Sequence, residues 1–242
     1  MHSGTNQTSF LVRTPENELI QAKAFQCLLP GEKNYRVYTC NAFSSLTNVD
    51  KPDFVVIGVK SYSLDKALND IEQAFGKDIP VLSVLNGVNH IEQISGRFSN
   101  AMFATIGFNA YRTSQIAAVA VGGALALSGI NPDSKILDEI FKILKRKISV
   151  SLVKKPSDAA HSKLVFNLGN ALLTIVAFHN NRNRDIPELQ HIMANIMWEG
   201  VRVLRKSGIK EARIPDMPPW VLLWLTKVLP SQLVVPIFKK KM

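Results

Sequence analysis

Short, nearly continuous apolar runs alternate with an amphipathic segment in the first half of the chain. The runs at 54–59 (FVVIGV) and 81–85 (VLSVL) are typical of strands buried on both faces of a parallel sheet. Between them, apolar residues recur at helical spacing, which predicts a strand–helix–strand unit. These residues are Leu64, Leu68, Ile71 and Phe75. With further strands expected at 9–12, 35–39 and 101–106, the pattern predicts a doubly wound α/β fold.

A stretch without charged residues follows at 113–132. Its apolar halves, 116–121 and 124–127, lie on either side of Gly122-Gly123. We expect these halves to form a β-hairpin around a Gly-Gly turn rather than a membrane span. An amphipathic helix is predicted at 133–146 and a last strand at 148–153.

From Pro156 onward the apolar spacing is helical, with long segments near 158–178 and 187–206. The pattern therefore predicts an α/β domain over residues 1–155 and an all-α domain over residues 156–242. Lys227, Pro230 and Pro236 interrupt the apolar stretch at 220–238, which we interpret as a packed helix or a surface anchor rather than a span.

Composition excludes several classes of protein. With 46% hydrophobic residues and only two cysteines, the chain is neither disordered nor a disulfide scaffold, and a cytoplasmic location is the default. The start of the chain does not have the pattern of a secretory signal. Residues 200–242 carry nine Lys and Arg against two acidic residues, which accounts for most of the net charge of +10. Nucleic-acid binding is not expected, because no zinc knuckle, RNP-like strand or basic heptad accompanies this charge.

Two polar groups follow predicted parallel strands. Lys60 comes after the first apolar run and Asn86-Gly87 after the second. Ligands bind outside the carboxyl ends of the strands in open α/β sheets, so both positions are candidates for one crevice. A lysine offers charge to a phosphate or carbonyl, and an amide both donates and accepts. The alternative is a solvated lysine and an ordinary turn.

A sharper pattern lies on the predicted helix at 158–178. Lys163, Asn167, Asn170 and Thr174 form one polar stripe on an otherwise strongly apolar helix. Asparagine is a poor helix former, so its recurrence favours a bonding role over a merely solvated face. Desolvation lowers the pKa of a partly buried lysine, which makes Lys163 a candidate general acid. No metal-binding, dithiol or nucleophile-elbow motif is present.

Four segments together resemble the ketopantoate reductase (2-dehydropantoate 2-reductase) family. They are SFLVR at 9–13, DFVVIGVKSYSLDKAL at 53–68, VLSVLNGVNHIEQI at 81–94 and SKLVFNLGNAL at 162–172. The resemblance implies a Rossmann-like NADP-binding domain followed by a helical substrate and dimerisation domain. It also implies reduction of the ketone of 2-dehydropantoate, or a related 2-keto acid, with NADPH in pantothenate biosynthesis.

The resemblance also implies roles for individual residues. Lys163 matches the family's catalytic lysine, which protonates the carbonyl oxygen as hydride arrives, and Asn167 matches its first substrate-binding asparagine. The second asparagine is expected at position 171, which is alanine here, and Asn170 lies one residue earlier.

On the cofactor side, Lys60 and Asn86 match family positions in the cofactor and substrate crevice. Arg13 resembles the arginine that pairs with the 2′-phosphate of NADPH, an interaction suited to a bidentate guanidinium.

The chain departs from the family pattern at both ends. The family begins with a strand and a GxGxxG turn, which does not occur in this sequence, and it normally continues into a Ser-Met and Asp segment. We therefore expect a Rossmann-like parallel sheet lacking its first strand and glycine-rich loop, in a chain truncated at both ends. The alternative to an enzyme is a non-catalytic remnant that acts as a binding or dimerisation module, for example as a homodimer. A further alternative is a protein whose basic, tryptophan-containing tail meets anionic lipid.

Overall fold

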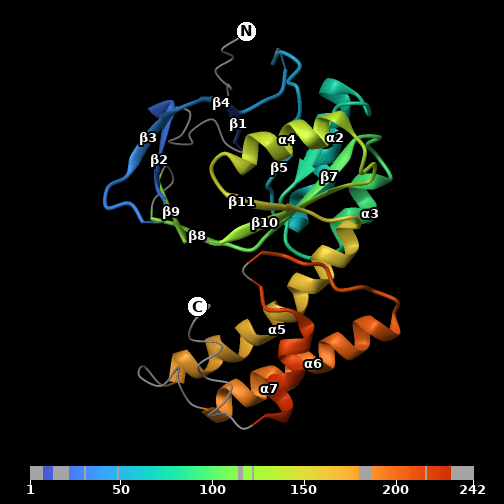
Figure 1. Cartoon of the computed structure of the whole chain (residues 1–242). Coiled ribbons are helices and arrows are strands. Elements are labelled where there is room, and N and C mark those ends of the chain that lie inside the picture. Colours follow the sequence, from blue (N-terminus) through green and yellow to red (C-terminus); the bar gives the residue numbers. More distant parts are fainter. Residues whose placement is uncertain are drawn as a thin grey trace.

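The structure is a computed structural model that describes residues 8–12, 22–29, 31–47, 49–113, 117–121, 123–179, 187–215 and 217–229. One part of the molecule contains the strands together with the helices α2, α3 and α4 (Figure 1). The long helix α5 leads from this part into a second part built of helices (Figure 1). The two parts follow each other along the chain, since β11 ends at Leu152 and α5 begins at Pro156.

A five-stranded sheet with the order β11-β10-β7-β6-β5 forms the centre of the first part. The strands are β5 (Val55–Ile57), β6 (Val81–Ser83), β7 (Ala101–Ile106), β10 (Ala124–Gly129) and β11 (Ser149–Leu152). Neighbours β5, β6 and β7 are parallel, which confirms the α/β fold predicted from the apolar runs. Strand β10 runs antiparallel to β7 and parallel to β11, so the sheet is mixed.

Helices cover both faces of this sheet, as a doubly wound fold requires. Helices α2 (Leu64–Phe75) and α3 (Asn89–Ser95) pack on one face, and α4 (Lys135–Lys145) packs on the other. Successive strand residues alternate between the two layers: Val81 packs with α2, and Leu82 packs with α4. Because both faces are buried, the strands read as continuous apolar runs in the sequence.

Two smaller sheets lie beside the central one. Strand β1 (Ser9–Leu11) pairs in parallel with β4 (Asn41–Phe43). A four-stranded sheet has the order β3-β2-β9-β8. Its strands are β2 (Ala24–Leu28), β3 (Arg36–Thr39), β8 (Asn109–Arg112) and β9 (Ala117–Val121). Strands predicted at 9–12 and 35–39 are thus present as β1 and β3.

The predicted hairpin between 116–121 and 124–127 is wrong. Both halves are strands, β9 and β10, but they belong to different sheets, and β9 pairs antiparallel with β8 instead. Gly123 lies where the chain enters β10 of the central sheet. A Cβ on Gly123 would lie 2.7 Å from the Cα of Phe108, so glycine is needed there for a close backbone approach, not for a turn.

Substitution of Gly123 by alanine is expected to lower the free energy of unfolding by about 1–3 kcal/mol, because the new methyl group meets backbone that cannot move aside cheaply. Urea unfolding followed by circular dichroism measures this loss. Gly58→Ala is the matched control, since its Cβ would lie 3.5 Å from Val84 Cγ2, an ordinary contact. Equal unfolding midpoints for the two variants would contradict the close-approach explanation.

The second part consists of α5 (Pro156–His179), α6 (Pro187–Lys206) and α7 (Trp220–Val228). Its core joins Val165 of α5, Val201 of α6 and Trp220 of α7. Helix α5 spans the predicted segment 158–178, and α6 spans the predicted segment 187–206. Within the part of the chain that the structure describes, no helix is both long enough and apolar enough to cross a bilayer.

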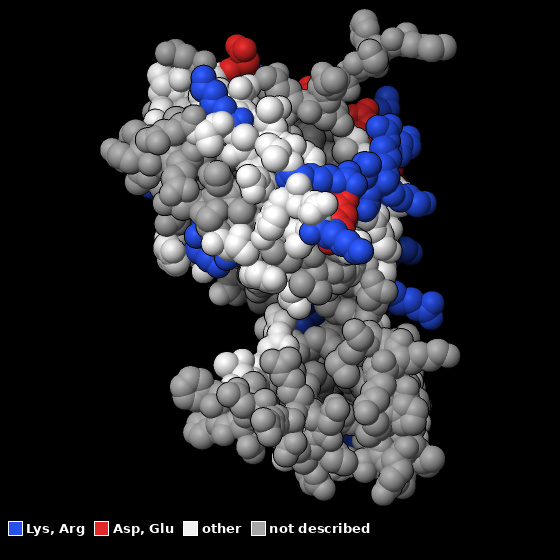
Figure 2. All heavy atoms as spheres, turned by 90° about the vertical axis from the view of Figure 1, so that its left-hand side faces the viewer, with Lys and Arg blue, Asp and Glu red and all other residues white. Residues whose placement is uncertain are grey.

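Among the charged side chains coloured in Figure 2, the basic ones predominate over the acidic ones. Besides the basic residues of the C-terminal region, exposed Lys142, Lys145, Arg146 and Lys147 lie at the end of α4 and just after it. The positive charge is therefore present on the sheet-containing part as well as in the C-terminal residues.

Candidate active site

The carboxyl ends of β5, β6 and β7 lie at one edge of the central sheet because these strands are parallel. Helix α5 packs against β7 and β10, and its first turns meet the loop that follows β6. A cleft lies between that loop and α5, lined on one side by Asn86 and Gly87 and on the other by Lys163 and Asn167. Gly87 has a φ of +94°, which glycine adopts without strain.

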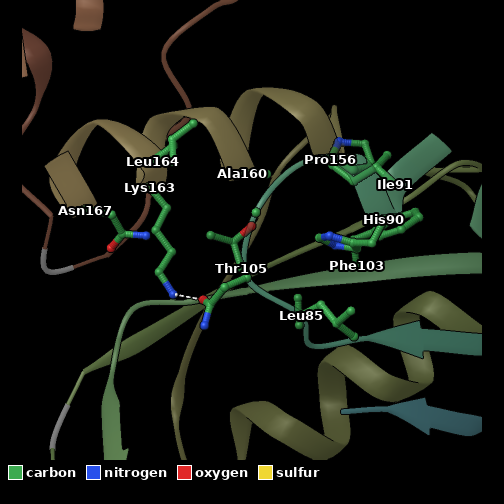
Figure 3. Close-up of a pocket in the computed structure, with 13 residues that line it drawn as sticks. Leu85, His90, Ile91, Phe103, Thr105, Pro156, Ala160, Lys163, Leu164 and Asn167 are labelled. Carbon is green, nitrogen blue, oxygen red and sulfur yellow. Dashed lines mark hydrogen bonds between the residues drawn. The ribbon is translucent and has the colours of Figure 1, made fainter. Parts of the chain in front are cut away.

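A hydrogen bond joins the two sides of this cleft. The Nζ of Lys163 donates to the Oδ1 of Asn86 over 2.6 Å, although the residues are 77 positions apart in sequence (Figure 3). The strand-end rule predicted Asn86 and the helical polar stripe predicted Lys163, and the structure brings the two together. Such an amide fixes the direction in which the ammonium group points.

The Lys163 side chain is half-buried, and burial lowers its pKa from the ordinary 10.5, because removal from water disfavours the charged ammonium. Among the described residues no carboxylate forms an ion pair with it. Its hydrogen bond to Asn86 partly replaces the lost hydration. A lysine so placed is suited to release a proton nearer neutrality than an exposed lysine.

The polar stripe of α5 lies only partly within the cleft. Asn167 lines the cleft one turn beyond Lys163. Asn170 is exposed, is not among the lining residues, and donates to the Oδ1 of Asn167 over 3.4 Å. The Thr174 hydroxyl donates to the carbonyl oxygen of Asn170. The structure therefore brings Asn167 to Lys163, and it connects Asn170 to the cleft only through Asn167.

Of the residues expected on the cofactor side, Asn86 lines this cleft and Lys60 does not. Lys60 is exposed and is the N-cap residue of the 3-10 helix η1 (Ser61–Ser63), the first helical turn after β5, without a capping hydrogen bond from its side chain. Arg13 lies outside the described residues. Within the described ranges no cluster of His, Cys, Asp and Glu side chains is arranged to hold a metal ion.

Sequence reasoning missed two polar residues of the cleft, His90 and Thr105. His90 lies in the first turn of α3, four residues after Asn86, and it is 7% exposed; Thr105 lies near the carboxyl end of β7 and is 8% exposed. The strand-end rule that found Asn86 also applies to Thr105. His90 carries no such signal, because only the packing of α3 against Phe103 shows that its ring is buried.

Burial also lowers the pKa of His90 from 6.5. Below pH 6.5 the unfolded chain therefore binds a proton that the folded chain does not, so stability falls as the pH drops toward the folded-state pKa. In that window the loss approaches about 1.4 kcal/mol per pH unit.

Urea unfolding at pH 7.5 and 5.5 measures this effect. We expect His90→Gln to lose less stability on acidification than the unaltered chain, and His191→Gln, at an exposed position of α6, to match the unaltered chain. Parallel pH dependence of the unaltered chain and His90→Gln would contradict it.

The sequence model of the family described as "Ketopantoate reductase PanE/ApbA" matches residues 1–129. The chain belongs to the ketopantoate reductase family. The matched residues include β5, β6 and β7 together with Asn86 and His90, so the sheet edge of the cleft lies inside the match.

Two curated relatives are named 2-dehydropantoate 2-reductase. The protein from Pyrococcus horikoshii is 25% identical over 209 residues, covering 81% of this chain and 64% of the relative. The protein from Lactococcus lactis is 26% identical over 95 residues, covering 39% of this chain and 30% of the relative. The chain thus spans less than two thirds of the length of either relative.

Solved structures share the fold at low sequence identity. A PanE/ApbA family ketopantoate reductase from Ralstonia eutropha aligns with a TM-score of 0.66 and 19% identity, covering 84% of this chain and 68% of that one. A dimeric ketopantoate reductase from Staphylococcus aureus has a TM-score of 0.61 and 16% identity, covering 96% and 78%. A D-mandelate dehydrogenase bound to NADH and anilino(oxo)acetate has a TM-score of 0.63 and 16% identity, covering 91% and 70%.

Proposed function

We propose that this chain reduces 2-dehydropantoate, or a related 2-keto acid, to the 2-hydroxy acid with NADPH in the cytoplasm. The hydrogen bond from Lys163 to Asn86 carries the proposal, because it aims a half-buried ammonium into a cleft at the carboxyl edge of a parallel sheet. Membership of the ketopantoate reductase family supports the reaction class. The names of the two curated relatives support 2-dehydropantoate as the substrate.

In the proposed mechanism Lys163 is the general acid. As the carbonyl carbon accepts a hydride, negative charge grows on the carbonyl oxygen, and the Lys163 ammonium stabilises this charge and then donates its proton to the oxygen. Asn86 holds the ammonium in place, and its amide nitrogen remains free to donate to the substrate. Asn167 lines the same cleft and offers a second amide to the substrate carboxylate.

The nicotinamide cofactor, when bound, supplies the hydride. The cleft edge has room for its reactive end: Gly87 lines the cleft and is exposed, and a Cβ on Gly87 would meet nothing within 4 Å. Lys60, exposed at the end of β5, is the proposed contact for a cofactor phosphate, and Asn86 the proposed contact near the nicotinamide. Neutral glycine and amide surfaces leave room for a planar ring there, next to Lys163.

Preference for NADPH is assigned to Arg13 on the family resemblance. Arg13→Ala is expected to weaken NADPH binding by about tenfold to a hundredfold and to change NADH binding little, because only NADPH carries the 2′-phosphate. Fluorescence titration of both cofactors measures the two Kd values. Equal losses for NADPH and NADH would remove Arg13 from the proposed site.

The function is tested by the initial rate of NADPH oxidation when 2-dehydropantoate is added to the full chain. Substrate-dependent oxidation, with pantoate as product, is the expected result. Binding of NADPH with no turnover of any 2-keto acid would refute the enzymatic proposal and favour the second candidate, a non-catalytic binding or dimerisation module.

Exposed apolar side chains on α5 favour this second candidate. Leu164 and Leu168, 39% and 38% exposed, present apolar surface along α5 beside the cleft, and such surface is typical of a docking face. We propose a homodimer through the helical part, in line with the dimeric relative of the same fold. Sedimentation equilibrium tests it: a monomer at all concentrations would contradict it.

A further inference from the structure

A second cavity lies where the two parts of the molecule meet. Its volume is about 360 Å³, toward the low end of the range typical of small-molecule sites. Its walls are β11, α5 and the chain between α6 and α7, which passes beside the first half of α5 (Figure 1). On α5 the cavity is lined by Ser162 and Phe166, whereas Lys163 and Asn167 line the active-site cleft. The cavity and the cleft therefore use different faces of the same helix.

Two hydrogen bonds hold the chain between α6 and α7 against the other walls of the cavity. The N–H of Ala212 donates to the Oγ of Ser162 over 3.0 Å. The Oγ of Ser151, on β11, donates to the carbonyl oxygen of Arg213 over 3.4 Å. The walls of the cavity are thus joined to one another through the backbone of this segment.

Most of the cavity lining is apolar. Its large side chains belong to Phe166, Met217 and Trp220, and Trp220 is 2% exposed. Three prolines and Ile214 also contribute to the lining. Such a surface binds the hydrocarbon part of a ligand, because removal of apolar surface from water is favourable.

One polar group in this lining has an unused hydrogen. Ser162 is 2% exposed, and its Oγ already accepts the N–H of Ala212. Among the residues that the structure describes, none accepts the hydrogen of this hydroxyl. A serine hydroxyl donates as well as accepts, so Ser162 is able to donate to an acceptor on a ligand.

The charged residues of the lining are Glu211 and Arg213, both exposed, which places their charge where the cavity opens to solvent. The Oε1 of Glu211 accepts the N–H of Trp220 over 2.7 Å, so its negative charge is already stabilised at the N-terminus of α7. No acidic side chain that the structure describes forms an ion pair with Arg213. Arg213 directly follows Ala212, which is bonded to Ser162, so a guanidinium and a hydroxyl donor belong to the same wall. Two such donors together favour a carboxylate.

We propose that this cavity is a binding site for a small hydrophobic carboxylate, separate from the candidate active site. The hydrocarbon body of the ligand lies among Phe166, Met217 and Trp220. Its carboxylate accepts hydrogen bonds from the Ser162 hydroxyl and the Arg213 guanidinium. The proposal does not depend on the proposed reaction, because the cavity and the active-site cleft share no lining residue.

Isothermal titration calorimetry with 4-phenylbutanoate tests the site, and 4-phenylbutanamide serves as a neutral probe of nearly the same shape. We expect one carboxylate to bind per chain and the amide to bind at least about tenfold more weakly, the range of a charge-assisted hydrogen bond. Arg213→Ala is expected to weaken the carboxylate by a similar factor and to leave the amide nearly unchanged. Arg202→Ala is the control, because it removes the same charge from an exposed position of α6, and it should bind both probes as the unaltered chain does.

Met217→Trp tests the cavity itself, because the larger side chain fills it without a change of charge. Both probes should bind more weakly to this variant. Unchanged affinities in the folded variant would show that the probes bind elsewhere and would overturn the inference.

Lys163→Ala separates the cavity from the active-site cleft, since the Lys163 ammonium also attracts carboxylates. We expect this variant to bind 4-phenylbutanoate as the unaltered chain does, and weaker binding would place the probe in the cleft and overturn the inference. Equal affinities of the unaltered chain for the carboxylate and the amide would overturn it as well. So would the absence of binding to a chain that circular dichroism shows to be folded, and none of these outcomes bears on turnover of a 2-keto acid.

Discussion

Replacement of Lys163 by alanine is expected to reduce turnover of a 2-keto acid by about 10²- to 10⁴-fold, the range typical of general-acid catalysis. The Kd for NADPH should change only a few-fold, because the ammonium acts on charge that develops on the substrate oxygen as hydride is delivered. The structure supports this separation, since Lys163 bonds to Asn86 in the cleft and lies on α5 rather than on a cofactor-side loop. Single-turnover kinetics and a cofactor titration on the same preparation measure the two effects.

Lys142→Ala is the control, because Lys142 is an exposed lysine on the far helix α4. It removes the same charge and should leave both constants unchanged. Normal turnover in Lys163→Ala would show that the polar stripe of α5 is a solvated face and that Lys163 is not the general acid.

Replacement of Asn86 by leucine is expected to lower the pH at which kcat begins to fall. The Asn86 oxygen accepts a hydrogen bond from the Lys163 ammonium and so favours its charged form, which opposes the effect of burial. Without that oxygen the pKa of Lys163 should fall further. A hydrogen bond to a charged group is worth about 1.5–3 kcal/mol, and the lower end of that range, roughly one pH unit, applies here because the Asn86 side chain is exposed.

The rate depends on the protonated form of Lys163, so kcat falls as the pH rises through its pKa. In Asn86→Leu this alkaline fall should begin about one unit lower than in the unaltered chain, with an increase in KM. Profiles of kcat against pH for both proteins measure the shift, and Asn41→Leu on the distant strand β4 serves as the control. An alkaline limb that stays in place would show that Asn86 does not tune Lys163.

The helices could be predicted because their signal is local. The spacing of Leu64, Leu68 and Ile71 marks the buried face of α2, and these residues contact the sheet as one stripe. The same holds for the bounds of α6. Central strands were equally readable, since burial on both faces makes each one a continuous apolar run.

Strand pairing could not be predicted in the same way. The partner of β9 is decided by contacts between segments distant in sequence, and β9 lies beside β2 as well as β8. Gly122-Gly123 has the composition of a hairpin turn, but Gly123 serves a close approach to Phe108. A single sequence contains no signal that separates these two uses of glycine.

In the candidate site too, residues that belong to a local sequence pattern could be predicted, and residues whose position depends on distant contacts could not. Lys163 and Asn86 could be found because each belongs to a recognisable local pattern, a polar stripe on a helix and the end of a strand. His90 could not be found from the sequence, since its burial against Phe103 depends on how α3 packs on β7. Lys60 follows the same strand-end rule, but η1 begins directly after it, and its exposed side chain does not line this cleft.

Deuterium transfer is the direct test of hydride reduction by this chain with Lys163 as the general acid. The full chain is mixed with NADPH carrying deuterium at the reactive nicotinamide carbon and with 2-dehydropantoate, and the product is analysed by mass spectrometry. Pantoate with one deuterium at C2 is the expected product, formed by the unaltered chain and at least about a hundredfold more slowly by Lys163→Ala. Unlabelled substrate recovered from a folded chain that binds NADPH would contradict it.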